Sequence, residues 1–133
     1  MTAPQTVTLW TAERANRALP LVRRIADDLV RTYDRWRKLV AEFELVSVGV
    51  TSAATAEAER LQREVQRAAE DIEGFVKELT ELGVECKSLE SGLFDFPSER
   101  DGRIVYLCWL HGERTVGHWH EVDGGFAGRQ PIV

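Results

Sequence analysis

The sequence predicts an α+β protein: a long antiparallel helical hairpin followed by a small antiparallel β-sheet of about three strands. Apolar residues recur at helical spacing through most of the first 83 residues. After Gly83 the spacing changes to alternation, which is typical of β-strands. Because the helical and strand patterns occupy separate parts of the chain, the sequence argues against repeated βαβ units.

The 133 residues are expected to form one domain (1–133), with the hairpin over 11–83 and the sheet and a glycine-rich tail over 84–133. The net charge of −5 is spread evenly along the chain and argues against a nucleic-acid partner. No run of about 18 apolar residues occurs, so no membrane partner is expected. Without a secretory signal, both cysteines are expected to be reduced in a cytoplasm, and a Cys86–Cys108 disulfide is the less favoured alternative.

The first helix is expected over Ala12–Leu19, with Thr11 as its N-cap. Pro20 should interrupt it, because proline has no amide hydrogen, and a long second helix is expected to begin there. The apolar seam of that helix alternates three- and four-residue steps, with Thr32 in its one gap, as in coiled coils. The seam consists of Val22, Ile25, Leu29, Trp36, Leu39, Phe43 and Val46.

Small residues over 47–54 predict a loop, after which a second seam follows without error. Its residues are Leu61, Val65, Ala68, Ile72, Phe75, Leu79 and Leu82. Gly83 is the expected left-handed C-cap. Two such helices joined by a short loop run antiparallel, each on the order of 40 Å long.

Four further apolar residues widen the stripe beyond one seam: Leu21, Tyr33, Val40 and Val76. The sheet can cover part of this surface, and a second copy of the hairpin can cover the rest as a four-helix bundle. We therefore expect a homodimer that forms through the helices.

In the last third, Leu93–Phe96 is expected to be a short strand that ends at Pro97. A polar turn follows over Ser98–Gly102, and Arg103–Trp109 is rich in residues that favour strands. Thr115–Val122 is expected to return as the partner strand of a hairpin. The glycine-rich tail after it is expected to be irregular.

The C-terminal third also carries a distinctive series of short motifs. They are Gly92-Leu93-Phe94-Asp95-Phe96-Pro97, Gly102-Arg103, Leu107-Cys108-Trp109, Gly112-Glu113, Trp119-His120 and Gly125-Phe126-Ala127-Gly128-Arg129-Gln130-Pro131. Together with Glu13–Pro20, which contains Asn16, they resemble an uncharacterised prokaryotic family, domain of unknown function 2203. The resemblance covers nearly the whole chain. It implies a prokaryotic cytosolic protein and brings no activity with it.

All three histidines fall between residues 111 and 120. His118 and His120 lie two apart on an expected strand, so both imidazoles point to one face and can bind one divalent metal ion, zinc or similar. The third ligand can be Cys108, Glu113 or Asp95. The alternative is that the histidines pack in a half-buried sheet face, with hydrogen bonds to backbone or to a carboxylate.

The register of the hairpin decides whether Cys108 belongs to this group. A two-residue turn at Gly112-Glu113 is favoured, and it puts Cys108 on the face opposite the histidines. A three-residue loop over 111–113 exchanges the faces and brings the thiol to the same side. Cys108 is expected to be an inert core thiol rather than a nucleophile, because its strand neighbours are apolar.

Two carboxylates are candidates for acid–base work or for ion pairs. Asp95 lies between two phenylalanines and Glu113 lies at the expected hairpin tip, and an ion pair with Arg103 or Arg129 is the favoured role. Arg129 and Arg103 are also candidates for anion binding, Arg129 together with the amides of the glycine-rich tail.

Two function hypotheses follow. The first is a non-enzymatic interaction protein that dimerises through its helices and presents the sheet and tail to a protein or small-molecule partner. The alternative is a metal- or small-ligand-binding protein, enzyme or not, that uses His118 and His120. A small ribonuclease toxin is disfavoured, because the sheet region has few basic residues.

Overall fold

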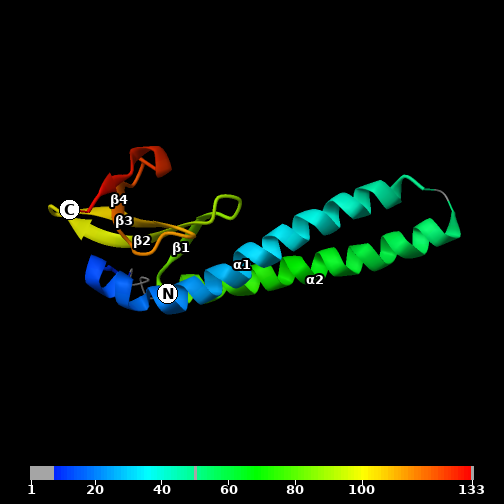
Figure 1. The fold of residues 1–133 in the computed structure, drawn as a ribbon, viewed down its shortest axis with the longest axis horizontal. Helices are drawn as coiled ribbons and strands as arrows, with labels where there is room; N and C mark the ends of the chain where they lie inside the picture. Colours follow the sequence, from blue (N-terminus) through cyan, green and yellow to red (C-terminus); the bar gives the residue numbers. More distant parts are fainter. Residues whose placement is uncertain (1–7, 50, 133) are drawn as a thin grey trace, which may run out of the picture.

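The computed structural model describes residues 8–49 and 51–132. Two long helices, α1 (Ala12–Ser47) and α2 (Ser52–Leu82), form an antiparallel hairpin, as Figure 1 shows. The chain then forms β1 (Glu85–Ser88), β2 (Leu93–Arg100), β3 (Arg103–Leu110), β4 (His118–Glu121), the short 3-10 helix η1 (Phe126–Gly128) and β5 (Gln130–Pro131). The predicted α+β class is confirmed, although the sheet has five strands rather than about three.

The hairpin extends far beyond the sheet, so the molecule has a thick end and a thin end (Figure 1). A large core joins the sheet to residues 12–30 and 72–82 of the helices, and we call this part the head. We call residues 31–71 of the hairpin the arm. A separate small core lies within the arm and consists of Leu39, Leu61 and Ala68, with Trp36, Phe43, Val46 and Val65 packed around them half-buried.

Helix α1 is continuous through Pro20, where the sequence predicts two helices. Thr11 is the N-cap, and its hydroxyl accepts a hydrogen bond from the backbone N–H of Arg14 at 3.1 Å. Leu19 and Val22, on either side of the proline, are both buried in the core of the head. The free energy gained by packing this face of the helix outweighs the loss of the one helical hydrogen bond that proline removes.

Both predicted seams lie along the contact between the helices, and their residues belong to the two cores. The loop between the helices is shorter than expected, because α2 begins at Ser52 after the cap residue Thr51. Gly83 ends α2 at φ 90°, the left-handed conformation that the sequence predicts.

The sheet is an antiparallel meander in the order β1-β2-β3-β4-β5. Its inner face packs on the helices, and its outer face points away from them. Alternation and register assign Phe94, Phe96, Val105, Leu107, Trp109 and Trp119 to the inner face. They assign Asp95, Tyr106, Cys108, His118 and His120 to the outer face.

Strand β2 runs through Pro97 to Arg100, so the prediction that Pro97 ends this strand is wrong. The carbonyl of Pro97 accepts a hydrogen bond from the backbone N–H of Trp10 at 2.7 Å, on the edge that faces away from β3. The proline nitrogen points to that same edge, where no ladder hydrogen bond is needed. The following turn is correspondingly tighter than expected, because Arg100 pairs directly with Arg103.

Cys86 and Cys108 are free thiols. Cys86 packs beside the inner core, whereas Cys108 lies on the outer face, so the sheet separates them. Within the described ranges, neither helix is apolar enough over a sufficient length to cross a membrane.

Candidate functional site

The observed register of β3 and β4 differs from both expected registers. Cys108 pairs with His118 and Tyr106 pairs with His120, and seven residues, 111–117, connect the strands. The favoured two-residue turn is therefore wrong, and Cys108 shares the outer face with both histidines.

The long connection forms because helix α1 holds it. The Asn16 side chain accepts a hydrogen bond from the backbone N–H of Val116 at 2.8 Å and donates one to its carbonyl at 3.1 Å. Arg23 donates to the carbonyl of Arg114 at 3.0 Å, and the indole N–H of Trp109 donates to the carbonyl of Glu113 at 3.0 Å. These contacts anchor residues 113–116, which follow a tight turn closed by the hydrogen bond from the backbone N–H of Glu113 to the carbonyl of Leu110 at 2.9 Å.

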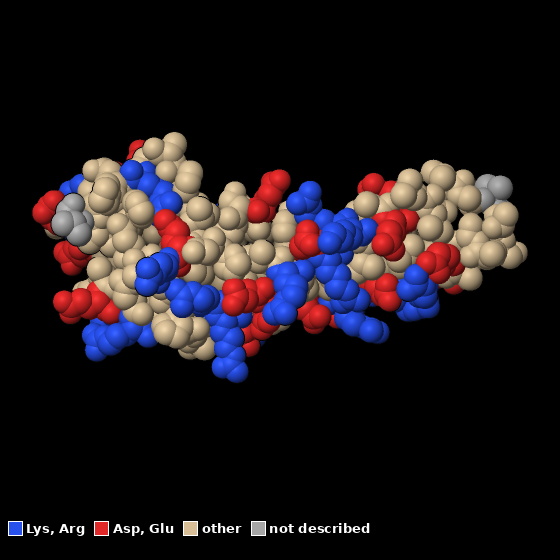
Figure 2. Space-filling view, in the orientation of Figure 1, with Lys and Arg blue, Asp and Glu red and all other residues tan. Residues whose placement is uncertain are grey.

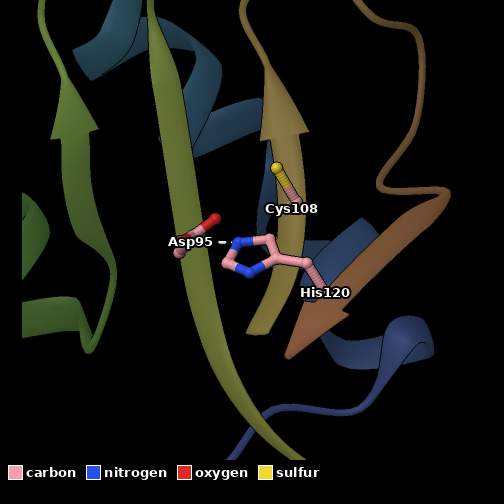
Figure 3. Close-up of side chains that lie close together, drawn as sticks. All are labelled: Asp95, Cys108 and His120. Atoms are coloured by element: carbon pink, nitrogen blue, oxygen red, sulfur yellow. Dashed lines mark hydrogen bonds and ion pairs between the residues drawn. The ribbon is translucent and has the colours of Figure 1, made fainter. Parts of the chain in front are cut away.

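Asp95 on β2 and His120 on β4 meet above β3, as Figure 3 shows. The Nε2 atom of His120 lies 2.9 Å from Oδ2 of Asp95, and both side chains are almost completely buried. Burial raises the pKa of Asp95, and the hydrogen bond with His120 partly offsets that rise. Asp95 thus pairs with a histidine, and the expectation that it pairs with an arginine is wrong.

The hydrogen bonds determine how many protons this pair shares. Nδ1 of His120 lies 2.7 Å from the carbonyl oxygen of Glu121, and it must donate because a carbonyl can only accept. A further proton lies between Nε2 and Oδ2, because neither an unprotonated nitrogen nor a carboxylate oxygen can donate. The pair is an imidazolium with a carboxylate, or a neutral imidazole with a carboxylic acid.

Cys108 completes the group on β3, and Figure 3 shows its thiol beside the Asp95 carboxylate. One ligand atom from each of Asp95, Cys108 and His120 lies within 4.8 Å of the others. Burial, reinforced by the neighbouring Asp95, raises the pKa of the Cys108 thiol to about 12. Without a cation beside it, this cysteine is a neutral thiol at physiological pH.

Glu113, Arg129 and His118 form a second polar group next to the first. Both oxygens of Glu113 accept hydrogen bonds from Nη2 of Arg129, at 2.6 and 2.9 Å, and Oε1 also accepts from the backbone N–H of Leu110 at 2.7 Å. Nδ1 of His118 lies 3.7 Å from Oε2 of Glu113. Glu113 is therefore already occupied by Arg129 and by the backbone.

Three buried side-chain nitrogen or oxygen atoms in the described residues lack a hydrogen-bond partner, and all three belong to these two groups. They are Oδ1 of Asp95, Nδ1 of His118 and Nε of Arg129. Buried polar atoms are normally paired, so an unpaired one points to a bound water, ion or ligand. Their concentration on one sheet face makes this face the candidate functional site.

The glycine-rich tail folds back and pairs with β4 rather than lying free, because Pro131 in β5 pairs with His118. It begins with a turn in which the backbone N–H of Gly124 donates to the carbonyl of Glu121 at 2.9 Å. Arg129 contacts the ring of the half-exposed Phe126 and pairs with Glu113. Arg103, the other arginine expected to bind an anion, forms an ion pair with Glu121 at the far end of β3.

The structure thus divides the four predicted metal ligands into two pairs. Asp95 lies with His120, and Glu113 lies with His118. Cys108 is one of the possible third ligands, and the favoured two-residue turn argues against it, whereas alternation in β3 and β4 puts it on the same face as the histidines. Leu107 and Trp119 are large apolar residues that face the core, so their neighbours Cys108, His118 and His120 must face the other way.

The molecule is thus a small α+β protein in which a helical hairpin arm is attached to an antiparallel sheet. The outer face of that sheet carries a buried polar cluster. The model of the family of uncharacterised conserved proteins called DUF2203 matches residues 8–132. The chain belongs to this family, as the sequence motifs predict. No curated protein and no solved structure matches the chain.

Proposed function

We propose that this protein is an interaction protein whose arm pairs with the arm of a second copy, leaving a head at each end of a four-helix bundle. The observation that carries the proposal is the incomplete burial of the arm seam. Four large seam residues, Trp36, Phe43, Val46 and Val65, are only half-buried by the two-helix packing. A second hairpin against this surface would complete their burial.

The charge distribution along the arm favours a second copy as the occupant. Residues 31–38 and 60–68, nearer the head, carry seven Lys or Arg and two acidic residues. Residues 39–47 and 52–59, nearer the tip, carry four glutamates and no Lys or Arg. Figure 2 shows the basic side chains gathered along the middle of the hairpin. In an antiparallel pair, the acidic tip of one copy would lie on the basic part of the other.

The proposal is tested by the oligomeric state. Light scattering on the purified chain at micromolar concentration should give twice the chain mass. Reversing the tip charges with Glu42→Lys and Glu44→Lys, both exposed, should weaken the dimer at least tenfold at low salt. Adding Arg35→Glu and Arg37→Glu should restore dimerisation, because the tip is then basic and the part nearer the head is more acidic, so opposite charges again face each other.

The matched control makes the same change of net charge in the head, with Glu78→Lys and Glu81→Lys on the exposed surface of α2. This variant should remain a dimer. A monomer in the native chain, or an effect of the control as large as that of the tip variant, would contradict the proposal.

A second function, divalent-metal binding on the outer face of the sheet, is favoured by two unpaired atoms that can ligate a metal, Oδ1 of Asp95 and Nδ1 of His118. The candidates are His118 and His120, with Asp95 and Glu113 nearby. Free thiols support a reducing cytoplasm as its location. Metal analysis of protein purified without chelators should find about one equivalent of a divalent ion, and His120→Ala should reduce it. Native protein that takes up no metal from a zinc-containing buffer would contradict this function.

A further inference from the structure

We infer that Asp95, Cys108 and His120 form one closed zinc-type site, with Cys108 as a thiolate ligand and with His118 and Glu113 outside it. This inference rests on the proposed metal-binding function and deepens it. The ligands come from three adjacent strands, β2, β3 and β4. They therefore converge from a rigid sheet rather than from loops.

The donor atoms suit zinc in kind and spacing. Zinc binds imidazole nitrogen at about 2.0 Å and thiolate sulfur at about 2.3 Å, so tetrahedral ligand atoms lie roughly 3 to 4 Å apart. The three observed donors lie within 4.8 Å of one another, and Nε2 of His120 lies 2.9 Å from Oδ2 of Asp95. Small side-chain movements suffice to admit the ion. Oδ1 of Asp95, which has no partner, lets the carboxylate bind through both oxygens, and the site is then a distorted tetrahedron because these two oxygens lie closer together than the other donors.

Charge supports the same assignment. A thiolate and a carboxylate together carry two negative charges, which a divalent cation neutralises, and the histidine binds as neutral imidazole. Burying a net charge is costly, whereas this complex has none. The backbone carbonyl of Glu121, which holds Nδ1 of His120 at 2.7 Å, fixes the tautomer that leaves Nε2 free for the metal.

Binding of the metal ion releases protons from its ligands. The thiol of Cys108 loses its proton, and the proton shared by His120 and Asp95 also leaves, so two protons are released for each ion bound. No oxidation or reduction takes part. Because the three residues are between 0 and 2% exposed, no position remains open to a substrate, and the site is structural rather than catalytic.

The test uses cobalt(II), which substitutes for zinc and reports its ligands by absorption. Metal-free full-length protein titrated with cobalt(II) should saturate at one equivalent. The spectrum should show the sulfur-to-cobalt charge-transfer band and the strong visible bands of a tetrahedral thiolate complex. Zinc should displace the cobalt and abolish both.

Variants then identify the ligands. Cys108→Ser should lose the charge-transfer band, and His120→Gln and Asp95→Asn should each weaken cobalt binding at least tenfold. Matched controls exist for the first two: Cys86→Ala should keep the band, and His118→Gln should bind cobalt as the native chain does. If His118→Gln loses binding as His120→Gln does, the assignment of a three-residue site is overturned.

The outcomes separate this inference from the broader function. If the native chain binds a metal without a charge-transfer band, metal binding stands and the Cys108 site is wrong. A native chain that binds no cobalt overturns both. If Cys108→Ser fails to fold, the native chain can be alkylated instead, at a denaturant concentration that partly unfolds it. One equivalent of zinc should then protect Cys108 from alkylation but not Cys86. Equal labelling of both cysteines with and without zinc would refute the site.

Discussion

At the scale of single residues, Asn16 determines the geometry of the candidate site from a distance. Its amide binds both backbone groups of Val116, a residue 100 positions away in the chain and almost fully buried. This pair of hydrogen bonds anchors the 111–117 connection to α1, and the connection leads into the register that places the polar residues on one face. Asn16 also belongs to the early motif that resembles the family.

We expect Asn16→Ala to lower the free energy of unfolding by about 1–3 kcal/mol, because it leaves the buried N–H and carbonyl of Val116 without partners. Urea denaturation followed by circular dichroism measures the change. Arg17→Ala, at the exposed neighbouring position, is the control and should change stability by less than about 0.5 kcal/mol. Equal effects of the two substitutions would refute the role assigned to Asn16.

The two cysteines should differ in reactivity in metal-free protein. Cys108 is completely buried and its pKa is raised to about 12, so iodoacetamide should leave it unlabelled at pH 8 while Cys86, half-buried, is labelled slowly. Peptide mass spectrometry reads both sites. Because the folded thiol keeps its proton to higher pH than the ordinary value of 9.0, its contribution to stability should be lost as pH rises from about 9 towards 12. Faster labelling of Cys108 than of Cys86 would contradict both expectations.

At the scale of elements, the residues that cap the helices predict the helix ends correctly, whereas the proline within α1 does not mark a helix end. Gly83 ends α2 in the left-handed conformation, and a Cβ there would lie 2.7 Å from the Cβ of Thr8. Gly74, in the exposed middle of the same helix, has open space where its Cβ would be. The glycine within α2 and the glycine at its C-cap therefore have opposite effects on stability.

Gly83→Ala should destabilise the protein by about 1–3 kcal/mol, since alanine is strained at this φ and would collide with Thr8. Gly74→Ala should stabilise it by about 0.5–1 kcal/mol, because alanine favours the helix more than glycine does. Thermal unfolding compares the two variants directly. A stabilising Gly83→Ala would show that the cap does not require glycine.

The sequence predicts the helices and the alternation of the strands well, because both follow from the local spacing of apolar residues. The predictions that Pro20 and Pro97 end their elements are wrong for a common reason. Tertiary packing holds Leu19 and Val22 in one helix, and Trp10 bonds to the free edge beside Pro97. The site was only partly predictable. Its register depends on Asn16, whose partner is remote in the sequence, so local turn rules favoured the wrong hairpin.

At the scale of the whole molecule, the head and the arm have separate cores. The core of the head contains most of the buried aromatic residues, whereas the core of the arm has three buried residues among those that the structure describes. Regions with few buried apolar contacts open more readily than the rest of a structure. In a single chain without its proposed partner, the arm should therefore unfold locally while the head stays folded.

Leu61→Ala removes a leucine side chain that is almost completely buried in the core of the arm. It should lower the free energy of unfolding by about 2–5 kcal/mol. Amide hydrogen exchange should accelerate over 36–46 and 61–68 and remain unchanged in β2 and β3. Leu29→Ala, in the core of the head, should instead accelerate exchange throughout the molecule. Uniform acceleration by both substitutions would mean that head and arm unfold as one cooperative unit.

The regular seam of the arm has a consequence for the family as a whole. Seven residues added to each helix would lengthen the arm by about 10 Å and return every apolar residue to the same side. The large core, the polar cluster and the Asn16 contacts all lie outside that segment. The length of the arm can therefore change almost independently of the other parts of the molecule. Relatives whose arms differ in length should differ by whole heptads, inserted or deleted in both helices together.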